Sequence, residues 1–562
     1  HLRAGIQLLS GEVLSRTIYS HLGWRMIDSD WVYLHAEGVV DTSKPVKVEP
    51  GEGRLNDYAL PNPSLGDELK RAVEASLSFL KLAPPTITFP LLAAAYRAPL
   101  DEALPIYFSI FLSGPTGSQK SELTAMAQAH FGARFHAKNL PGNWSSSENH
   151  LEKQAFLAKD ALFVVDDFAP VGSMSEVQRL HRKADRLIRA QGNRTGRGRM
   201  RPDGSLRPEY YPRGLILSSG EDIPKGQSIR ARMLILEISP GDVDLALLTR
   251  TQEDAANGTL ALAMAAYIAW LAPQIDSMKK SFPSRHLELR AEARQKNLLH
   301  DRTPDILAGL LLGYETFLQF ALESEVLSQD ERDDSWNEAL VALVDAAKAQ
   351  ASHQESEEPT GRFMDLLRSA ISSGHAHITE AKTGGEPEES RTWGWRDRPS
   401  KSDQFGGSDR QAQGERIGWI DGSALFLDPE AAFAIVQKFA SIQGSNLPIT
   451  QRILWKRMAE KGLLASQESS RNTTRVTIEG NRRRVIHIES DVLYSKTGPI
   501  GPNGPSSGNQ AVSWSNNGDR SSKEFANSDL KNGPQIQPPF ALGPHGPIGP
   551  EIEDKSRNIS GF

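Results

Sequence analysis

The sequence predicts an α/β fold around a parallel β-sheet, because three apolar runs each end in residues suited to a ligand site. The first run, 106–112, leads into the segment GPTGSQKS at 114–121 and then into a helical pattern. The second run, 161–165, ends in the acidic pair 166–167, and the third lies within RGLILSSGE at 213–221. Continuous apolar runs are typical of strands buried on both faces, and parallel sheets bind ligands at the carboxyl ends of their strands. We therefore expect these three ends to meet at one site.

The composition is that of a multidomain protein with ordinary hydrophobic cores. The chain has 562 residues, 38% of them hydrophobic, no cysteine and a formal net charge of −6. This length favours roughly three or four domains, and the small net charge means that attraction to a polyanion must come from local patches. The lack of cysteine excludes disulfides and cysteine-bound zinc and is ordinary for a cytoplasmic protein. No uninterrupted apolar run approaches the roughly 18 to 20 residues of a membrane span, so we expect no membrane contact.

The N-terminal part, residues 1–100, is predicted to hold a β-hairpin and a helical platform. Strands at 24–27 and 31–35 flank Asp28, Ser29 and Asp30, which are ordinary turn residues. Asp28 and Asp30 could also form an acidic metal-binding pair, but no third ligand can be assigned, so the turn is favoured. Helices are expected at 69–82 and 91–96. Because the sequence starts at a residue other than Met, we also expect an upstream region.

The segment 114–121 has the spacing of a phosphate-binding loop. Its glycines let successive N–H groups face a phosphate, next to the positive end of the following helix. Lys120 would contact the β and γ phosphates of ATP, and the Ser121 hydroxyl would bind Mg²⁺. A glycine-rich turn that contains Lys-Ser by chance is the alternative. Gln119 stands where a glycine is usual, so its side chain must face away from the nucleotide. The expected nucleotide-binding residues are Gly114, Pro115, Thr116, Gly117, Ser118, Gln119, Lys120 and Ser121.

The acidic pair after the second run is the candidate metal and water site. Asp166 would hold Mg²⁺, directly or through water, and Asp167 would position the attacking water. Acidic strand ends are common, so the pair gains its meaning from its place some fifty residues after the phosphate loop. Asp167 is one methylene shorter than the glutamate common at this position in ring-forming ATPases.

Further catalytic candidates lie on the third and fourth strands. Ser218 and Ser219 end the third run, where a hydroxyl could bind the attacking water or the γ-phosphate. Arg230 and Arg232 precede an apolar run at 233–238, and one of them could stabilise the γ-phosphate of a neighbouring subunit. Solvated arginines at a strand start are an equally good interpretation.

The segment 178–213 is strongly basic and favours a polyanion. It carries eleven Lys and Arg residues against Asp185, Asp203 and Glu209. Its first part reads as a helix to about Ala190, and its second as a hairpin with Pro202-Asp203-Gly204 at the turn. Such a hairpin could grip the backbone of a single nucleic-acid strand by charge, although a solvated basic helix and loop would look the same. The candidate contacts are Arg194, Arg197, Arg199, Arg201 and Arg207.

The order GPTGSQKS, FVVDDF, basic segment, LILSSGE and SIRARMLILEI resembles the P-loop ATPase domain of primase-helicases carried by phages and integrative elements. The similarity covers roughly residues 15–275 and extends to superfamily III and AAA+/RecA-like ring helicases. It implies an ATP-driven motor that acts on DNA, as a single strand or a fork, with ATP and Mg²⁺. It also implies a homo-oligomer in the form of a hexameric ring, and an upstream primase region. Gln119 and Asp167 depart from the family pattern.

The C-terminal half is predicted to be helical, then mixed. We expect an ATPase core at 101–250, a helical lid at 251–350, a linker with one helix at 351–416 and a disordered tail at 491–562. Residues 417–490 resemble a winged helix, whose hairpin around Gly480 would bring Arg482, Arg483 and Arg484 to phosphates. A small domain that only packs on the lid is the alternative. His375 and His377 have the spacing of a metal pair, but strand or loop residues are favoured.

Two other functions stay open for the whole chain. One is a DNA-binding replication or regulatory module in which ATP only sets assembly, and the other is an ATPase that remodels proteins. The departures at Gln119 and Asp167 keep the first alternative open, whereas the basic hairpin argues against the second.

Overall fold

The computed structural model describes residues 17–40, 46–51, 53–296, 302–356, 358–397, 410–442, 447, 449–468 and 471–494. The predicted disordered tail lies outside these residues from position 495 onward, and so do the first sixteen positions.

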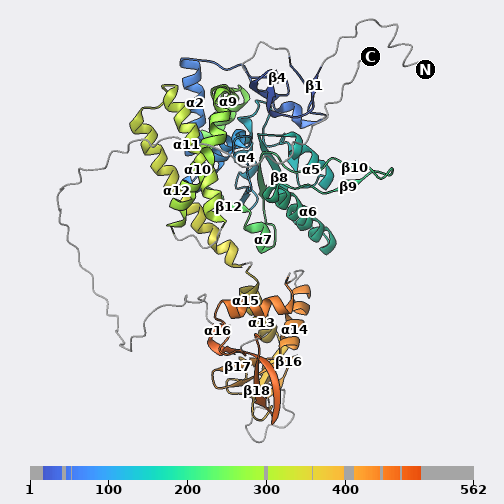
Figure 1. Cartoon of the computed structure of the whole chain (residues 1–562). Helices are drawn as coiled ribbons and strands as arrows, with labels where there is room; N and C mark the ends of the chain where they lie inside the picture. The colour runs from blue at the N-terminus through green and yellow to red at the C-terminus, as the bar shows by residue number, and fades with distance from the viewer. Residues whose placement is uncertain are drawn as a thin grey trace, which may run out of the picture. The chain divides into compact units, whose positions relative to one another are not determined.

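Five parallel strands form the central sheet, in the order β12-β6-β11-β8-β7 (Figure 1). Every residue of β6 and β11 is buried, as the continuous apolar runs predict. Because β11 lies between β6 and β8, the end of the third run adjoins both the phosphate loop and the acidic pair. The strands are β6 (Ser109–Ser113), β7 (Gly142–Asn143), β8 (Leu162–Phe168), β11 (Leu215–Gly220) and β12 (Met233–Glu237).

The first strand begins three residues later than its apolar run. The backbone N–H of Ile106 donates to Asp101 Oδ1 at 2.7 Å, and its carbonyl accepts from Gln191 Nε2 at 3.1 Å. Side chains therefore satisfy the backbone where the sheet would otherwise do so, and the ladder starts only at Ser109.

Four helices follow the strands of the sheet. The helix α5 starts after Ser147, because the Ser147 hydroxyl accepts from the N–H of His150. The helix α6 starts earlier than expected, at a capping box in which Ser173 and Glu176 satisfy each other's backbone N–H groups. These helices are α4 (Lys120–Ala129), α5 (Glu148–Leu157), α6 (Met174–Asn193) and the short α7 (Gln227–Arg230).

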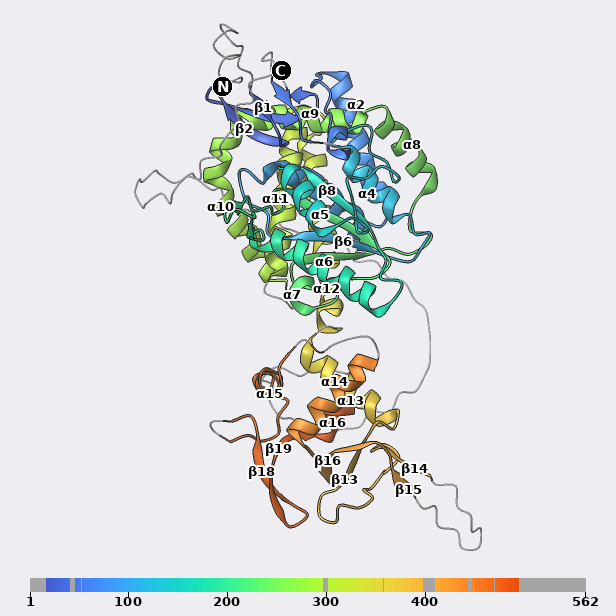
Figure 2. The same ribbon diagram turned by 90° about the vertical axis from the view of Figure 1, so that its right-hand side faces the viewer.

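The remaining helices of this part share one hydrophobic core with the sheet. The predicted platform and lid are not separate cores, because α2 packs on α9, α3 packs on α11 and α12, and α12 packs on β12. Figures 1 and 2 place α11 and α12 on the side of the sheet opposite α5 and α6. The helices are α2 (Asp67–Ser78), α3 (Pro85–Arg97), α8 (Leu245–Ala256), α9 (Thr259–Leu271), α10 (Ile275–Arg294), α11 (Thr303–Glu323) and α12 (Gln329–Ser356), with short 3₁₀ turns η1 (Arg54–Asp57), η2 (Phe79–Lys81), η3 (Ala98–Leu100) and η4 (Ala272–Gln274).

Among the residues that the structure describes, two helical stretches are long and apolar enough by mean hydropathy to cross a membrane. They are Thr259–Arg294 and Thr303–Glu323, and 61% and 78% of their most apolar windows are buried inside the structure. The expectation that no stretch reaches this length is therefore too strict, since it counted only uninterrupted runs. Burial of this extent is what core helices show.

The N-terminal strands form the predicted hairpin and pack on the core. The turn at Asp28 and Ser29 has positive φ values of 50° and 73°. The antiparallel pair is β2 (Gly23–Ile27) and β3 (Asp30–His35), extended by β4 (Gly38–Val39), and a parallel pair is formed by β1 (Ile18–Tyr19) and β5 (Lys47–Val48).

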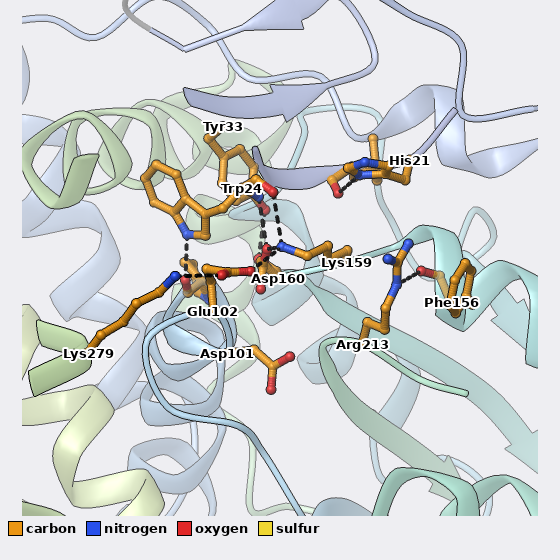
Figure 3. A network of polar contacts seen from close by, with 12 residues as sticks. His21, Trp24, Tyr33, Asp101, Glu102, Phe156, Lys159, Asp160, Arg213 and Lys279 are labelled. Atoms are coloured by element: carbon orange, nitrogen blue, oxygen red, sulfur yellow. Dashed lines mark hydrogen bonds and ion pairs between the residues drawn. The ribbon is translucent and has the colours of Figure 1, made fainter. Parts of the chain in front are cut away.

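A buried polar network joins this hairpin to the core (Figure 3). The Asp160 carboxylate accepts from the backbone N–H of Trp24 at 2.8 Å and from the Lys159 ammonium, and the Asp160 carbonyl accepts from the Tyr33 hydroxyl at 2.8 Å. Lys159 also donates to Glu102 at 2.8 Å, and Glu102 accepts from Lys279 at 2.8 Å. The hairpin is thus held by charged groups of which Asp160 is fully buried and Lys159 largely so.

A buried histidine makes the fold sensitive to acid. His130 is fully buried, its Nδ1–H donates to the carbonyl of Met126 at 3.1 Å, and its Nε2 accepts from Ser76 at 2.9 Å. Burial lowers the pKa of His130 from 6.5 to about 4.

Acidification should therefore destabilise the protein between pH 6.5 and pH 4. Above pH 6.5 the histidine is neutral in both states, but below it the unfolded state takes up a proton that the folded state refuses. We expect His130 to account for roughly 3 kcal/mol of lost stability at pH 4. Denaturant unfolding of the protein and of His130→Gln, followed from pH 7 to pH 4, measures this. An equal pH dependence in both would contradict the assignment.

The C-terminal part has its own sheet and core and begins earlier than predicted. Its strand order is β13-β16-β17-β19-β18, with β13 parallel to β16 and the other pairs antiparallel. Phe363, Leu367 and Ile378, from the expected linker 351–416, are fully buried in this core, so that segment is part of the domain. The elements are α13 (Pro359–Ser372), β13 (Ala376–Glu380), β14 (Trp395–Asp397), β15 (Arg410–Ala412), β16 (Glu415–Asp421), β17 (Ala424–Leu427), α14 (Pro429–Ile442), α15 (Gln451–Glu460), β18 (Thr474–Ile478), β19 (Asn481–Glu489) and α16 (Ser490–Tyr494).

The winged helix stays a prediction. The predicted hairpin around Gly480 is present together with a strand pair and two helices, but β13 adds a parallel edge strand to the sheet. Thr450 precedes α15, although its side chain makes no capping hydrogen bond.

Candidate active site

The phosphate loop joins β6 to α4, as its sequence predicts. Gly114 lies against the end of β12, the neighbour of β6 in the sheet, since a Cβ there would be 2.2 Å from the carbonyl oxygen of Ile238. Gly117 has φ 85° and open space around it, so its role is conformational. Gln119 has φ 63°, a left-handed conformation that explains why glycine is usual at this place. The loop thus tolerates glutamine at a cost in backbone strain.

Replacing Gln119 by glycine should remove that strain. We expect Gln119→Gly to stabilise the fold by about 1 kcal/mol or less, because holding a residue other than glycine in the left-handed conformation costs a free energy of this order. Urea unfolding measures the change. A loss of stability would show that contacts of the Gln119 side chain outweigh the strain.

Lys120 begins α4 and reaches back over the loop. Its ammonium donates to the Pro115 carbonyl at 2.7 Å and lies 3.4 Å from the Ser118 hydroxyl. Burial lowers the pKa of Lys120, while the carboxylates of Glu221, Asp166 and Asp167 act in the opposite direction. Of these three, Glu221 has the largest effect. The ammonium is therefore held over the loop by the Pro115 carbonyl, while the carboxylates on two strand ends favour its charged form.

Ser121 and Asp166 meet at the loop, although they come from different elements. The Ser121 hydroxyl donates to Asp166 Oδ1 at 3.1 Å, and the Ser219 hydroxyl donates to the same oxygen. Magnesium prefers oxygen ligands at about 2.1 Å in an octahedron, so neighbouring ligands lie about 3 Å apart. Ser121 and Asp166 therefore fit one Mg²⁺ as adjacent ligands.

Asp167 and Ser218, the other members of the acidic pair and the serine pair, take no part in the contact between Ser121 and Asp166. Asp167 is exposed and has φ 68°, at a bulge where β8 and β11 change register. Ser218 is buried, accepts from Trp144 Nε1 at 2.6 Å and donates to the Val165 carbonyl at 2.9 Å. Of the two candidate serines, Ser219 alone contacts Asp166, whereas Ser218 is occupied in holding Trp144 against the sheet.

Sequence reasoning missed Glu221 and Trp144. Glu221 directly follows β11, and its carboxylate accepts from the Thr116 hydroxyl of the phosphate loop. The signal was present, because Glu221 ends the segment RGLILSSGE at 213–221, but only Ser218 and Ser219 of that segment were considered as site residues. Trp144 is fully buried, and its backbone N–H donates to the Asp166 carbonyl at 2.9 Å. No pattern in the sequence places it there.

Arg230 and Arg232 are both largely buried, each with 8% exposure. Arg230 Nε donates to the Pro224 carbonyl at 3.2 Å. Arg232 donates to the Ser228 carbonyl at 2.6 Å and to Asn193 at 3.1 Å. In this conformation both guanidinium groups form hydrogen bonds within their own chain.

The basic hairpin is present, with β9 (Arg199–Met200) antiparallel to β10 (Leu206–Arg207). It projects beyond α5 and α6 (Figure 1).

The five candidate arginines divide into two groups. Arg194 forms an ion pair with the buried Asp101 at 2.7 Å, Arg199 pairs with Glu152, and Arg197 lies 3.8 Å from Glu148. Arg201 and Arg207 are exposed near the turn. The ion pairs of Arg194 and Arg199 support the fold, whereas the side chains of Arg201 and Arg207 are open to a ligand.

The C-terminal arginines lie at the start of β19, near the hairpin tip, as predicted. Arg482 is exposed, Arg483 stacks over the Trp419 ring and lies 3.4 Å from Glu479, and Arg484 lies 3.9 Å from Glu468. Among the residues that the structure describes, no three histidine or acidic side chains are placed to share a metal ion, so neither His375 with His377 nor Asp28 with Asp30 gains a third ligand.

Comparisons with known proteins identify the fold. No family model and no curated protein matches this chain. A solved structure described as the active helicase Cch of SCCmec type IV is similar over 88% of this chain and 84% of its own, with 12% identity and a TM-score of 0.54. A solved structure of the JCV helicase with a bound phenylacetamide compound matches over 44% of this chain and 66% of its own at 15% identity, but its TM-score of 0.23 is too low to support an argument. The fold of this chain is therefore helicase-like.

Proposed function

We propose that this chain is an ATP-dependent DNA helicase or translocase of a phage or mobile-element replication protein. The contact of Ser121 with Asp166 is the observation that carries the proposal, since it builds an oxygen site for Mg²⁺ beside a phosphate loop. The similarity of the fold to a helicase supports the reaction class. We further propose that the protein acts in the cytoplasm as a ring of identical subunits with an upstream primase.

In this proposal each site residue has one task. The loop N–H groups of 114–121 and the Lys120 ammonium bind the phosphates of ATP, and Ser121 and Asp166 hold Mg²⁺, which offsets phosphate charge. Ser219 orients Asp166 through its hydrogen bond. Since Arg230 and Arg232 are bonded within the chain, a contact across a subunit boundary would require either of them to leave its present partners.

ATP turnover with Mg²⁺, measured with and without single-stranded DNA, tests the proposal. A motor gives turnover that DNA stimulates. Nucleotide binding without turnover would favour a switch that only sets assembly, and turnover indifferent to DNA would favour a protein-remodelling ATPase. Light scattering with and without ATP measures whether a ring forms.

The exposed hairpin arginines should contribute to DNA affinity by charge. For Arg201→Ala with Arg207→Ala we expect weaker single-strand binding and a salt dependence shallower by about 0.7 per lost phosphate contact. Fluorescence anisotropy at several salt concentrations measures both. The pair Lys153→Ala with Arg250→Ala removes the same charge from exposed helix positions and is the control. Equal slopes for the two double variants would remove the hairpin from the DNA site.

A further inference from the structure

Glu221 occupies the point where the phosphate loop, the acidic pair and the third strand meet. Its backbone N–H donates to the Phe168 carbonyl at 3.1 Å, and the preceding carbonyl, of Gly220, accepts from the N–H of Gly114 at 3.2 Å. The position is therefore fixed from both sides, by β8 and by the phosphate loop.

Gly220 is required for this placement. A Cβ on Gly220 would lie 2.5 Å from the Phe168 carbonyl oxygen, so only glycine lets β11 approach the end of β8 this closely. The close approach brings the next residue, Glu221, over the gap between β6 and β8.

The Glu221 side chain faces the phosphate loop. It accepts from the Thr116 hydroxyl in the middle of the loop, and it is the carboxylate with the largest electrostatic effect on Lys120. Lys120 is the residue that contacts the terminal phosphates in loops of this kind. A carboxylate beside Thr116 and Lys120 therefore lies at the γ-phosphate end of the site.

We propose that Glu221 is the carboxylate that accepts a proton from the attacking water, a role for which the sequence suggested Asp167. This inference rests on the proposed function. In the step, the water oxygen forms a bond to the γ-phosphorus, and the bond from that phosphorus to the bridging oxygen breaks. The electron pair of the broken bond leaves with the diphosphate, and the water proton passes to Glu221.

Two features of the site favour Glu221 over Asp167. Glutamate is longer by one methylene, and Glu221 already touches the phosphate loop, whereas Asp167 lies at the bulge of β8 with a left-handed backbone. The two carboxylates flank the same gap, so the chain offers a matched pair of isosteric variants.

The test compares Glu221→Gln with Asp167→Asn. We expect Glu221→Gln to lower kcat about 100-fold or more, the effect of losing a general base. Asp167→Asn should cost less than about tenfold, and both should bind a fluorescent ATP analogue within about threefold of the unmodified chain. The reverse order of the two effects on kcat would overturn the assignment to Glu221.

A third variant separates chemistry from loop support. Thr116→Val removes the hydroxyl that donates to Glu221 but keeps the carboxylate. If Glu221 only fastens the loop, Thr116→Val and Glu221→Gln will change nucleotide affinity and kcat alike, and the proposal fails. If the unmodified chain binds no nucleotide, the proposed function itself fails, a result distinct from binding with unchanged turnover in Glu221→Gln.

Discussion

Lys120→Ala is expected to abolish ATP turnover while leaving the fold intact. The side chain contacts only the loop around Pro115 and Ser118, so its removal leaves the hydrophobic core untouched. In the proposed function its ammonium is the positive charge at the terminal phosphates, and losing one preorganised charge in such a site costs about 100-fold to 1,000-fold in rate. Phosphate release assayed with Mg²⁺ and saturating ATP measures the loss.

Lys153→Ala provides the matched control for this experiment. Lys153 is exposed on α5, so this variant loses the same charge away from the loop. We expect its turnover to equal that of the unmodified chain. Turnover retained in Lys120→Ala would mean that the phosphates bind elsewhere, and the nucleotide site described above would be wrong.

The candidate site was predictable where one local pattern fixes both backbone and chemistry. The phosphate loop is such a case, because Gly117 and Lys120 define a strand, a turn and a helix start within a few residues. The meeting of Ser121 with Asp166 followed from the rule that parallel strands share one ligand edge, although the residues are far apart in sequence.

The parts that escaped prediction depend on partners distant in sequence. Arg194, Arg199 and Arg201 lie in the same basic stretch of sequence. Arg194 and Arg199, however, pair with acidic residues on other elements, which the stretch itself does not reveal. The same holds for Arg232, whose partners include Asn193. Charge patterns thus predicted a basic region and could not tell the arginines that pair with other elements from those that are exposed near the turn.

The boundary of the C-terminal domain was misplaced for a related reason. The stretch 383–413 is rich in polar residues and glycine, which is typical of a linker, yet β13 before it pairs with β16 after it. A parallel pair needs a long connection between its strands. Local composition therefore described the connection and missed the sheet that it joins.

Lys159→Met should destabilise the fold by roughly 3 to 5 kcal/mol at pH 8, the usual result of leaving one partner of a buried ion pair unpaired. Lys159 has 14% side-chain exposure and Asp160 has none, and both sit where the N-terminal hairpin meets the core (Figure 3). The exposed pair of Lys382 and Asp421 is the control, since Lys382→Met should cost about 1 kcal/mol or less. Urea unfolding of both variants measures the difference.

The pH dependence of this loss identifies its cause. Burial raises the pKa of Asp160 to about 7, so the folded state favours the neutral acid, and an unpaired carboxylate would favour it more. The deficit of Lys159→Met relative to the unmodified chain should therefore shrink as the pH falls from 8 towards 5, because protonation removes the unpaired charge. Adding Asp160→Asn should recover much of the stability at pH 8, since the amide oxygen can still accept from the N–H of Trp24. A deficit that is constant with pH and unrelieved in the double variant would instead point to lost packing of the Lys159 methylenes, and the network would then be incidental to how the hairpin is held.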